Sequence, residues 1–219
     1  MDFSKFTNHL CLSHEEKITA YNIRYQAYTD VDYEPITATG LYQDEFDEAD
    51  NHFTFLLKEA GKPMATARVS IKCGELNWPT VPCERGFVEE FKDLSQQHPV
   101  IMEMGRLAVL PDTRGVASIA PLALYANAFA FLPYFESILM VCASGKKHKR
   151  FYERMGMQSA TGFASRPHCA IDLCLMTAPL MMVPYLEQTG MNKAQLFSLM
   201  PDLSPVLSQQ QFSPMPISA

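Results

Sequence analysis

Residues 102–120 read Met102-Glu-Met-Gly-Arg-Leu-Ala-Val-Leu-Pro-Asp-Thr-Arg-Gly-Val-Ala-Ser-Ile-Ala120, and this stretch decides the fold. It begins as an apolar strand that carries one acid, Glu103, and one base, Arg106. A Pro-Asp turn then leads through Arg114 and Gly115 to an Ala-rich helical segment. The first-turn N–H groups of a helix have no partner within the helix, so such a turn is suited to binding an anion. The stretch therefore predicts a strand–turn–helix unit with an anion site at the turn.

The two charges on this strand determine how its faces are arranged. Glu103 and Arg106 are three residues apart, so strict alternation would place them on opposite faces. A bulge near Met104 and Gly105 would add one residue and bring them to the same side, and glycine makes a bulge easy to form. A bulge also turns a strand away from its neighbour. We therefore expect a splayed central strand with a slot beside it.

Segments on either side of this strand alternate between helix and strand patterns. Ser13-His-Glu-Glu16 is a capping box at the start of an amphipathic helix, and strand patterns at 53–59 and 63–72 flank a hairpin turn. Further strands are expected over 100–110, 137–143, 157–164 and 168–176. Helices are expected over 87–94, after the turn up to about 131, after the run 145–150 up to 155–156, and around 180–188 and 192–200. This order predicts one α/β (α+β) domain over residues 1–203, with C-terminal helical pieces between about 178 and 203. A Pro/Ser/Gln-rich tail over 204–219 is expected to be disordered.

The composition excludes several classes of protein. With 219 residues, 47% hydrophobic residues and a net charge of −6, the chain can form a core and is too acidic for a general nucleic-acid binder. The N-terminus lacks the basic region and apolar run of a signal peptide, and no apolar stretch reaches membrane-spanning length, so we expect a soluble cytoplasmic protein. The six cysteines form no CxxC pair, which favours buried thiols over disulfides or a zinc site. No metal is expected.

Four charged residues near the N-terminus form a separate pattern. Arg24 borders the buried stripe of the first helix and Arg68 lies in the middle of a strand, so each needs a carboxylate partner. Asp44 and Asp47 lie between them in sequence and are the natural partners. A structural ion-pair network is the simplest interpretation; whether one arginine also binds a substrate carboxylate is a hypothesis.

The order of elements resembles the GNAT acyltransferase fold. Two segments carry the likeness: Leu107-Ala-Val-Leu-Pro-Asp-Thr-Arg-Gly-Val-Ala117, similar to the family's pyrophosphate loop, and Arg150-Phe-Tyr-Glu-Arg-Met-Gly-Met157, similar to its last helix-to-strand passage. The resemblance implies a mixed central sheet with a splayed, bulged central strand and helices on both faces. The loop departs from the family pattern, because Asp112 stands where Gln or Arg is common and Ala117 and Ser118 replace glycines.

A closer resemblance is to the branch of acyl-homoserine lactone synthases and FeeM-type N-acyl amino acid synthases. Four motifs carry it, in that branch's order: Ile23-Arg24-Tyr25-Gln-Ala-Tyr28, Asp44-Glu-Phe-Asp47, Ala67-Arg68-Val69 and Met102-Glu103-Met-Gly-Arg106-Leu-Ala-Val109. Lactone synthases carry a Trp a few residues beyond the aromatic matched by Tyr28, whereas this chain has Asp32-Tyr33-Glu34 there. The resemblance therefore favours an enzyme that acylates an amino acid. It implies an acceptor pocket shaped by Arg24, Tyr28, Asp44, Asp47, Arg68 and Arg106.

The resemblance also implies a general base at Glu103. Acyl transfer to an amine needs a proton removed from the ammonium form, and a partly buried carboxylate with a raised pKa does this best. The alternative is a structural ion pair of Glu103 with Arg106 or Arg68. Tyr152 matches the tyrosine that protonates the leaving thiolate, and its alternative role is core packing. The thioester and pantetheine of the donor would be held by Leu107, Ala108, Val109, Arg114, Gly115, Val116, Ala117 and Ser118.

One dense positive patch stands out on this acidic chain. It consists of Lys146, Lys147, Lys149 and Arg150. An acidic acyl carrier protein is a suitable partner for such a patch. A solvated helix face is the alternative interpretation.

Together these features predict an N-acyltransferase that moves a long-chain fatty acyl group from acyl carrier protein or CoA to the amine of an amino acid or a similar small amine. No permanently bound cofactor is expected. Methionines such as Met102 and Met140 suit a flexible acyl chain, although core filling explains them equally well. The alternatives are an acyl-homoserine lactone synthase, an acetyl-CoA-dependent N-acetyltransferase and a non-catalytic module that binds acyl carrier protein.

Overall fold

A computed structural model describes residues 3–31, 38–113, 119–167, 169, 171–182, 187 and 192–208. The chain forms two compact units. Unit 1 comprises residues 1–69, 106–134 and 193–219, and unit 2 comprises residues 70–105 and 135–192. The chain passes from one unit to the other within two strands, and the single domain expected over residues 1–203 stays a prediction. The two units are described in turn.

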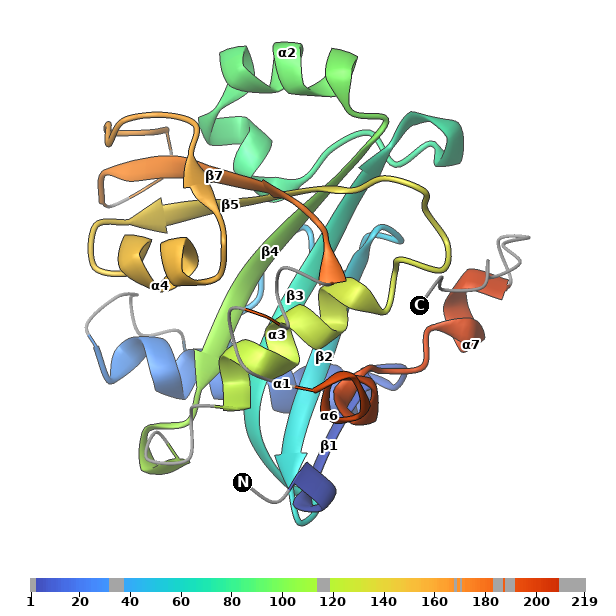
Figure 1. The fold of residues 1–219 in the computed structure, drawn as a ribbon. Coiled ribbons are helices and arrows are strands. Elements are labelled where there is room, and N and C mark those ends of the chain that lie inside the picture. The colour runs from blue at the N-terminus through green and yellow to red at the C-terminus, as the bar shows by residue number, and fades with distance from the viewer. Residues whose placement is uncertain are drawn as a thin grey trace. The chain divides into compact units, whose positions relative to one another are not determined.

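The strands form a mixed seven-stranded sheet with the order β1-β2-β3-β4-β5-β7-β6. Figure 1 labels each of these strands except β6. The strands are β1 (Phe6–Leu10), β2 (His52–Glu59), β3 (Lys62–Cys73), β4 (Val100–Val109), β5 (Leu139–Gly145), β6 (Gln158–Ser159) and β7 (Leu173–Pro179). The α-helices are α1 (His14–Thr29), α2 (Val88–Gln97), α3 (Ile119–Phe129), α4 (Lys149–Arg154), α6 (Lys193–Leu199) and α7 (Ser204–Leu207). The 3₁₀ turns are η1 (Phe3–Lys5), η2 (Gly74–Leu76), η3 (Pro82–Gly86) and η4 (Pro111–Thr113). This arrangement confirms the predicted α/β class with a mixed central sheet.

Unit 1 is built on the capped helix and the hairpin that the sequence predicted. The Ser13 side chain accepts a hydrogen bond from the Glu16 N–H while the Glu16 side chain accepts one from the Ser13 N–H, so the capping box is present at the start of α1. β2 and β3 are joined by Ala60 and Gly61, which have φ values of 47° and 82°. Two consecutive left-handed residues suit the right-handed twist of a hairpin. The hairpin at the predicted position is therefore confirmed.

The core of unit 1 lies between α1 and the strands beside it. Buried side chains of α1 pack against Leu56 of β2 and Ala108 of β4. α6 lies against both β1 and α3 within this unit (Figure 1). The sequence patterns missed β1, because its five residues include Thr7, Asn8 and His9, and a short polar strand gives a weak signal. β1 pairs antiparallel with β2 from Phe6↔Glu59 to Leu10↔Phe55.

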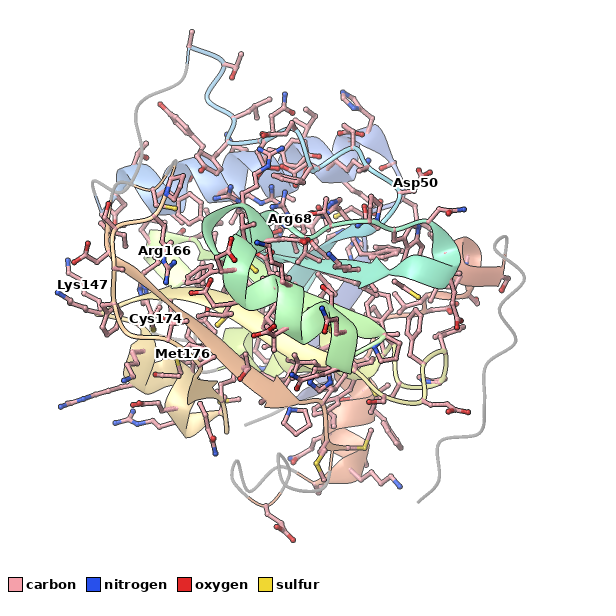
Figure 2. All side chains as sticks on the ribbon, turned by 90° about the horizontal axis from the view of Figure 1, so that it is seen from above. Asp50, Arg68, Lys147, Arg166, Cys174 and Met176 are labelled. Atoms are coloured by element: carbon pink, nitrogen blue, oxygen red, sulfur yellow. The ribbon has the colours of Figure 1, made fainter. Side chains whose placement is uncertain are left out.

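Unit 2 is built on β5 and β7, which run antiparallel side by side from Leu139↔Pro179 to Gly145↔Leu173 (Figure 1). One face of this pair carries Val141 and Leu175 and packs on Phe87 and Phe91 from η3 and α2. The other face carries Cys142, Cys174 and Met176, of which the last two are labelled in Figure 2. The sheet is thus buried on both faces here, as its apolar sequence indicated.

The boundaries of the last strands differ from the prediction. A strand was expected over 157–164, but β6 comprises only Gln158 and Ser159. A strand was expected over 168–176, but β7 begins at Leu173 and runs to Pro179. Most residues between 160 and 172 are at least partly exposed, so no buried face fixes a strand there. The segment expected to be disordered from residue 204 begins with α7, whose Leu207 is buried.

In the part of the chain that the structure describes, no helix is both long enough and apolar enough to cross a bilayer.

Candidate active site

The central feature of unit 2 is the point at which β4 and β5 stop pairing. They run parallel over the pairs Ile101↔Leu139, Met102↔Met140 and Glu103↔Val141. β4 continues beyond Glu103, and β5 stays paired with β7 as far as Gly145. Among the described residues of this unit, Glu103↔Val141 is the last pair between the two strands. The predicted splay of the central strand is therefore confirmed, and Glu103 lies at its apex.

Glu103 is a buried carboxylate that accepts a hydrogen bond from the backbone. Its side chain is 8% exposed, and its Oε2 atom accepts a hydrogen bond of 2.7 Å from the backbone N–H of Cys83. Cys83 stands in the first turn of η3, where N–H groups have no partner within the helix. The other oxygen, Oε1, lies 3.3 Å from the position a Cβ atom would take on Gly105. Gly105 thus leaves space beside the second oxygen of this carboxylate.

Tyr152 lies on α4 of the same unit and reaches the strand that parts from β4. Its hydroxyl hydrogen-bonds the thiol of Cys142, the residue that follows the last β4–β5 pair. Burial and the charge of Glu103 raise the pKa of the Cys142 thiol, while the hydrogen bond from Tyr152 lowers it in part. Glu103 and Tyr152 therefore both act electrostatically on one buried thiol. The structure brings the predicted base and the predicted acid to the neighbourhood of the same side chain.

Unit 1 contains a buried network of ion pairs that unites the predicted pocket residues. Arg24 Nη1 donates to both carboxylate oxygens of Asp47 at 2.8 Å, and its Nη2 donates to Thr54 Oγ1 at 3.3 Å. Arg68, labelled in Figure 2, donates from Nη1 to Asp44 at 2.6 Å and to Asp47 at 2.8 Å. The backbone N–H of Asp44 also donates to Asp47, at 2.9 Å. The predicted pairing of both arginines with this acidic loop is confirmed.

The same network extends to Arg106 through Asp44. Arg106 donates to Asp44 Oδ2 from Nε at 3.1 Å and from Nη2 at 2.6 Å, and Nη1 donates to the Tyr42 hydroxyl at 3.0 Å. Tyr42 in turn packs edge-on against Tyr28, with ring centroids 5.1 Å apart. All six residues expected to shape the acceptor pocket therefore belong to one connected cluster in unit 1.

The charges in this cluster stabilise one another. Burial opposes ionisation of Asp44, but the neighbouring guanidinium groups of Arg68 and Arg106 outweigh it and lower the pKa of this carboxyl well below its ordinary value. Burial likewise opposes the charge of Arg106, but Tyr28, Tyr42 and Asp44 raise its pKa further. His52, at the edge of the cluster, is buried beside Arg68, and burial together with that charge lowers its pKa to about 4. The cluster is charged at neutral pH, whereas His52 is neutral.

The proposed donor-binding residues are only partly described. Arg114, Gly115, Val116, Ala117 and Ser118 lie outside the described residues, so the anion site at this turn stays a prediction. Leu107, Ala108 and Val109 lie in unit 1 at the end of β4. Leu107 lines a small cavity of about 10 Å³ that is partly open to solvent. The other residues of its lining are Asn8, Phe55, Leu57, Ala65, Thr66, Ala67, Ala123 and Asn127.

Two of the four cations in the predicted docking patch are paired. Lys146 lies 3.6 Å from Asp172, and Lys149 lies 3.4 Å from Glu153. Both ammonium groups also lie over the Phe163 ring. Lys147 and Arg150 are exposed (Figure 2 labels Lys147) and form no ion pair within the described part of the chain. The patch therefore presents two unneutralised cations.

Sequence patterns missed the residues that hold the predicted ones in place. Cys83 acts on Glu103 through a backbone N–H, which no residue type encodes. Cys142 lies in an apolar run where a thiol is indistinguishable from core. Of these residues, Tyr42 alone could have been predicted from the sequence, because it stands two positions before Asp44 in the acidic loop. Among the described residues, no group of three or more His, Cys, Asp or Glu side chains is arranged to hold a metal ion.

Comparison with known proteins identifies a family and a set of similar folds. The family model described as N-acyl amino acid synthase FeeM matches residues 19–179. The comparison with curated proteins gave no match. The solved structure of FeeM, an N-acyl amino acid synthase from uncultured soil microbes, has a TM-score of 0.64 and 13% identity over 85% of this chain and 98% of that chain.

Lactone synthases show a similar likeness in structure. BjaI, a CoA-dependent acyl-homoserine lactone synthase solved with SAM and isopentyl-CoA, has a TM-score of 0.60 and 13% identity over 94% of this chain and 99% of that chain. MesI, another CoA-dependent lactone synthase, has a TM-score of 0.59 and 16% identity over 90% of this chain and 99% of that chain. At such identities the likeness concerns the fold.

Proposed function

Because this chain belongs to the family of FeeM N-acyl amino acid synthases, we propose that it transfers a long-chain fatty acyl group from a thioester donor to the amine of an amino acid. Its family and its neighbours in structure make it a GNAT-type N-acyltransferase. The observation that carries the proposal is the position of Glu103, a buried carboxylate at the last pair between β4 and β5. A strand that parts from its neighbour leaves backbone N–H and C=O groups available for a substrate.

In the proposed reaction Glu103 is the general base. Its Oε2 atom accepts a hydrogen bond from the Cys83 N–H, and its Oε1 atom is the proposed acceptor of a proton from the ammonium group of the acceptor, directly or through one water. The neutral amine then attacks the thioester carbonyl carbon, the new C–N bond forms and the C–S bond breaks. Backbone N–H groups between Leu107 and Val109 are the proposed donors to the oxyanion. The products are an amide and a free thiol.

Tyr152 is the proposed general acid. It would give its hydroxyl proton to the thiolate that leaves the carbonyl carbon. Its hydrogen bond to Cys142 supports this role, because Cys142 directly follows the last β4–β5 pair. The nitrogen loses a second proton when the C–N bond forms, and this proton restores the phenol, while the proton held by Glu103 is released to solvent. An ammonium acceptor therefore yields the amide, the free thiol and one proton.

We propose acyl carrier protein as the donor, with CoA as the alternative. The exposed cations Lys147 and Arg150 support a docking surface for an acidic protein. Replacing both by glutamate should raise KM for an acyl carrier protein thioester at least tenfold and leave KM for the matching CoA thioester within threefold. Equal effects on the two donors would contradict the docking assignment, and a wild-type enzyme that uses only CoA would contradict the choice of donor.

The experiment that tests the function measures release of free thiol and mass of the product. Wild-type protein, Glu103→Gln and the control Glu89→Gln are incubated with a dodecanoyl thioester and a mixture of amino acids. Glu89 is the matched control, because it lies on α2 of the same unit with a side chain 78% exposed. Glu103→Gln should lower kcat by a factor of about 100 to 10,000, and the control should stay within twofold.

Three results would contradict the proposal. A wild-type protein that binds the thioester but forms no amide would be a binding module. Lactones formed from SAM, with no N-acyl amino acid, would establish the lactone-synthase alternative. Transfer of acetyl groups in preference to dodecanoyl groups would establish the acetyltransferase alternative.

A further inference from the structure

The ion-pair network of unit 1 has more positive than negative groups. Its guanidinium groups belong to Arg24, Arg68 and Arg106, and its carboxylates belong to Asp44 and Asp47. Three cations and two anions leave one positive charge without a partner in the network. His52 does not change this balance, because its lowered pKa of about 4 keeps it neutral. A buried cluster with an excess charge is unfavourable unless an anion joins it.

Of the three guanidinium groups in this network, one is exposed enough to contact a ligand from solvent. Arg24 and Arg68 have side chains that are 0% and 2% exposed, whereas the Arg106 side chain is 26% exposed. Arg106 donates three hydrogen bonds to described residues, one from each of its nitrogen atoms. A guanidinium has five N–H groups, so one N–H on Nη1 and one on Nη2 remain. Two such groups form the fork that binds a carboxylate through both oxygens.

The position of this guanidinium is fixed from two sides. Asp44 binds Nε and Nη2, and the Tyr42 ring lies against the guanidinium carbon at a distance of 4.9 Å from its centroid. Tyr28 in turn packs edge-on against Tyr42. A guanidinium held in this way loses little conformational freedom when a ligand binds, which favours affinity.

The backbone at Arg106 is strained, and the strain favours a functional role. Its φ angle is 53°, in the left-handed region that non-glycine residues rarely adopt. Glycine would adopt this conformation without strain, and it occupies the preceding position, 105. The chain nevertheless places an arginine at 106. Strain of this kind is kept where a side chain has to be aimed at a particular place, and it is concentrated at ligand sites.

We infer that Arg106 binds the α-carboxylate of the acceptor. The enzyme then accepts amino acids as free acids and discriminates against their amides and against the amines that lack the carboxyl group. Binding the carboxylate through both oxygens also fixes the direction of the Cα–N bond, because the amine is attached to the adjacent carbon. This inference rests on the proposed transfer to an amine and names the part of the acceptor that the network recognises.

The experiment compares acceptors and variants with a dodecanoyl thioester as the donor. The acceptors are the twenty amino acids, their primary amides and, for the best acid, the decarboxylated amine. Wild type should show a kcat/KM at least tenfold higher for the best acid than for its amide or amine. Arg106→Gly removes the guanidinium and relieves the strained φ, so the variant should fold. It should raise KM for the acid by about 10- to 100-fold and change KM for the amide less than threefold.

Two further variants separate recognition from general effects. Arg106→Lys keeps the charge without the fork and should recover part of the preference for the acid. Arg85→Gln removes an exposed arginine of unit 2 and should leave the preference unchanged. Equal use of acid and amide by the wild type would overturn the inference and leave the proposed transfer standing. A uniform loss for all acceptors in Arg106→Gly, with an unchanged melting temperature, would also overturn it. The absence of transfer to any amine by the wild type would overturn the proposed function and this inference with it.

Discussion

Replacing Asp47 by asparagine tests the account of the buried network most directly. The Asp47 side chain is 1% exposed and accepts hydrogen bonds from Arg24, from Arg68 and from the backbone N–H of Asp44, at 2.8 to 2.9 Å. Asparagine has nearly the same shape but no charge, and one of its two acceptor oxygens becomes an NH₂ donor. The variant takes from Arg24 its one carboxylate in the network and leaves Arg68 with Asp44, which also binds Arg106.

The expected loss of stability follows from the burial of these groups. Removing one partner of a buried ion pair costs about 3–5 kcal/mol, because it leaves a charge without compensation. Domains have total stabilities of about 5–15 kcal/mol, so Asp47→Asn should remove a large part of the free energy of unfolding. For a chain of this length a loss of about 4 kcal/mol lowers the melting temperature by roughly 8–16 °C.

The control is the next carboxylate along the chain. Glu48 pairs with Lys17 at 2.8 Å, but its side chain is 66% exposed, so Glu48→Gln should cost no more than about 1 kcal/mol. Urea denaturation followed by circular dichroism measures both variants, and the slope with denaturant shows whether unfolding stays two-state. If the two substitutions destabilise the protein equally, the buried network does not carry the stability assigned to it here.

Three further predictions concern acidity, the acyl chain and the base. In the folded protein the pKa of His52 is about 4, below its ordinary 6.5, so the unfolded state binds a proton first and the protein should lose stability as pH falls from about 6.5 to 4. His52→Gln should make the free energy of unfolding less dependent on pH in this range. An unchanged pH dependence in the variant would contradict the assignment. Ala67→Leu adds more volume than the small cavity beside Leu107 holds, so an acyl chain that passes along this side of β3 should become restricted and the preferred donor should shift from dodecanoyl to shorter thioesters, whereas an unchanged chain-length profile would show that the acyl group binds elsewhere. Gly105→Ala should crowd Oε1 of Glu103 and lower kcat at least tenfold with little change in melting temperature; full activity in this variant would mean that Oε1 is not the proton acceptor.

The sequence predicted those parts of the fold that depend on local rules. The capping box at Ser13, the hairpin turn at Gly61 and the pairing of Arg24 with Asp47 follow from spacing and from the cost of an unpaired buried charge, and the structure contains all three. The splay was predicted from a glycine in a central strand. The left-handed residue in that region is Arg106 rather than Gly105, so the irregularity of the strand lies one position further along than glycine preference alone indicated.

The missing parts depend on contacts that no local pattern encodes. Glu103 accepts a hydrogen bond from the backbone N–H of Cys83, twenty residues earlier in sequence, and no residue pattern predicts such a contact. β7 extends to Pro179 because β5 supplies a partner as far as Leu139, and a pairing partner cannot be identified from the strand itself. Tertiary pairing therefore decided the strand boundaries and the surroundings of the base, while residue chemistry decided which groups needed partners.

The buried network is difficult to explain by stability alone. Replacing a buried ion pair with apolar residues of similar volume is often neutral or stabilising, so a chain selected only to fold would gain nothing from Arg24, Asp47 and Arg68. Asp44 provides the missing reason, because one of its oxygens binds Arg68 and the other binds Arg106. The buried part of the network fixes Asp44, and Asp44 fixes Arg106, the most exposed of the three guanidinium groups. In this account the buried charges of unit 1 hold the Arg106 guanidinium in position for its ligand. The cost of burying them is offset when the carboxylate of the acceptor binds Arg106.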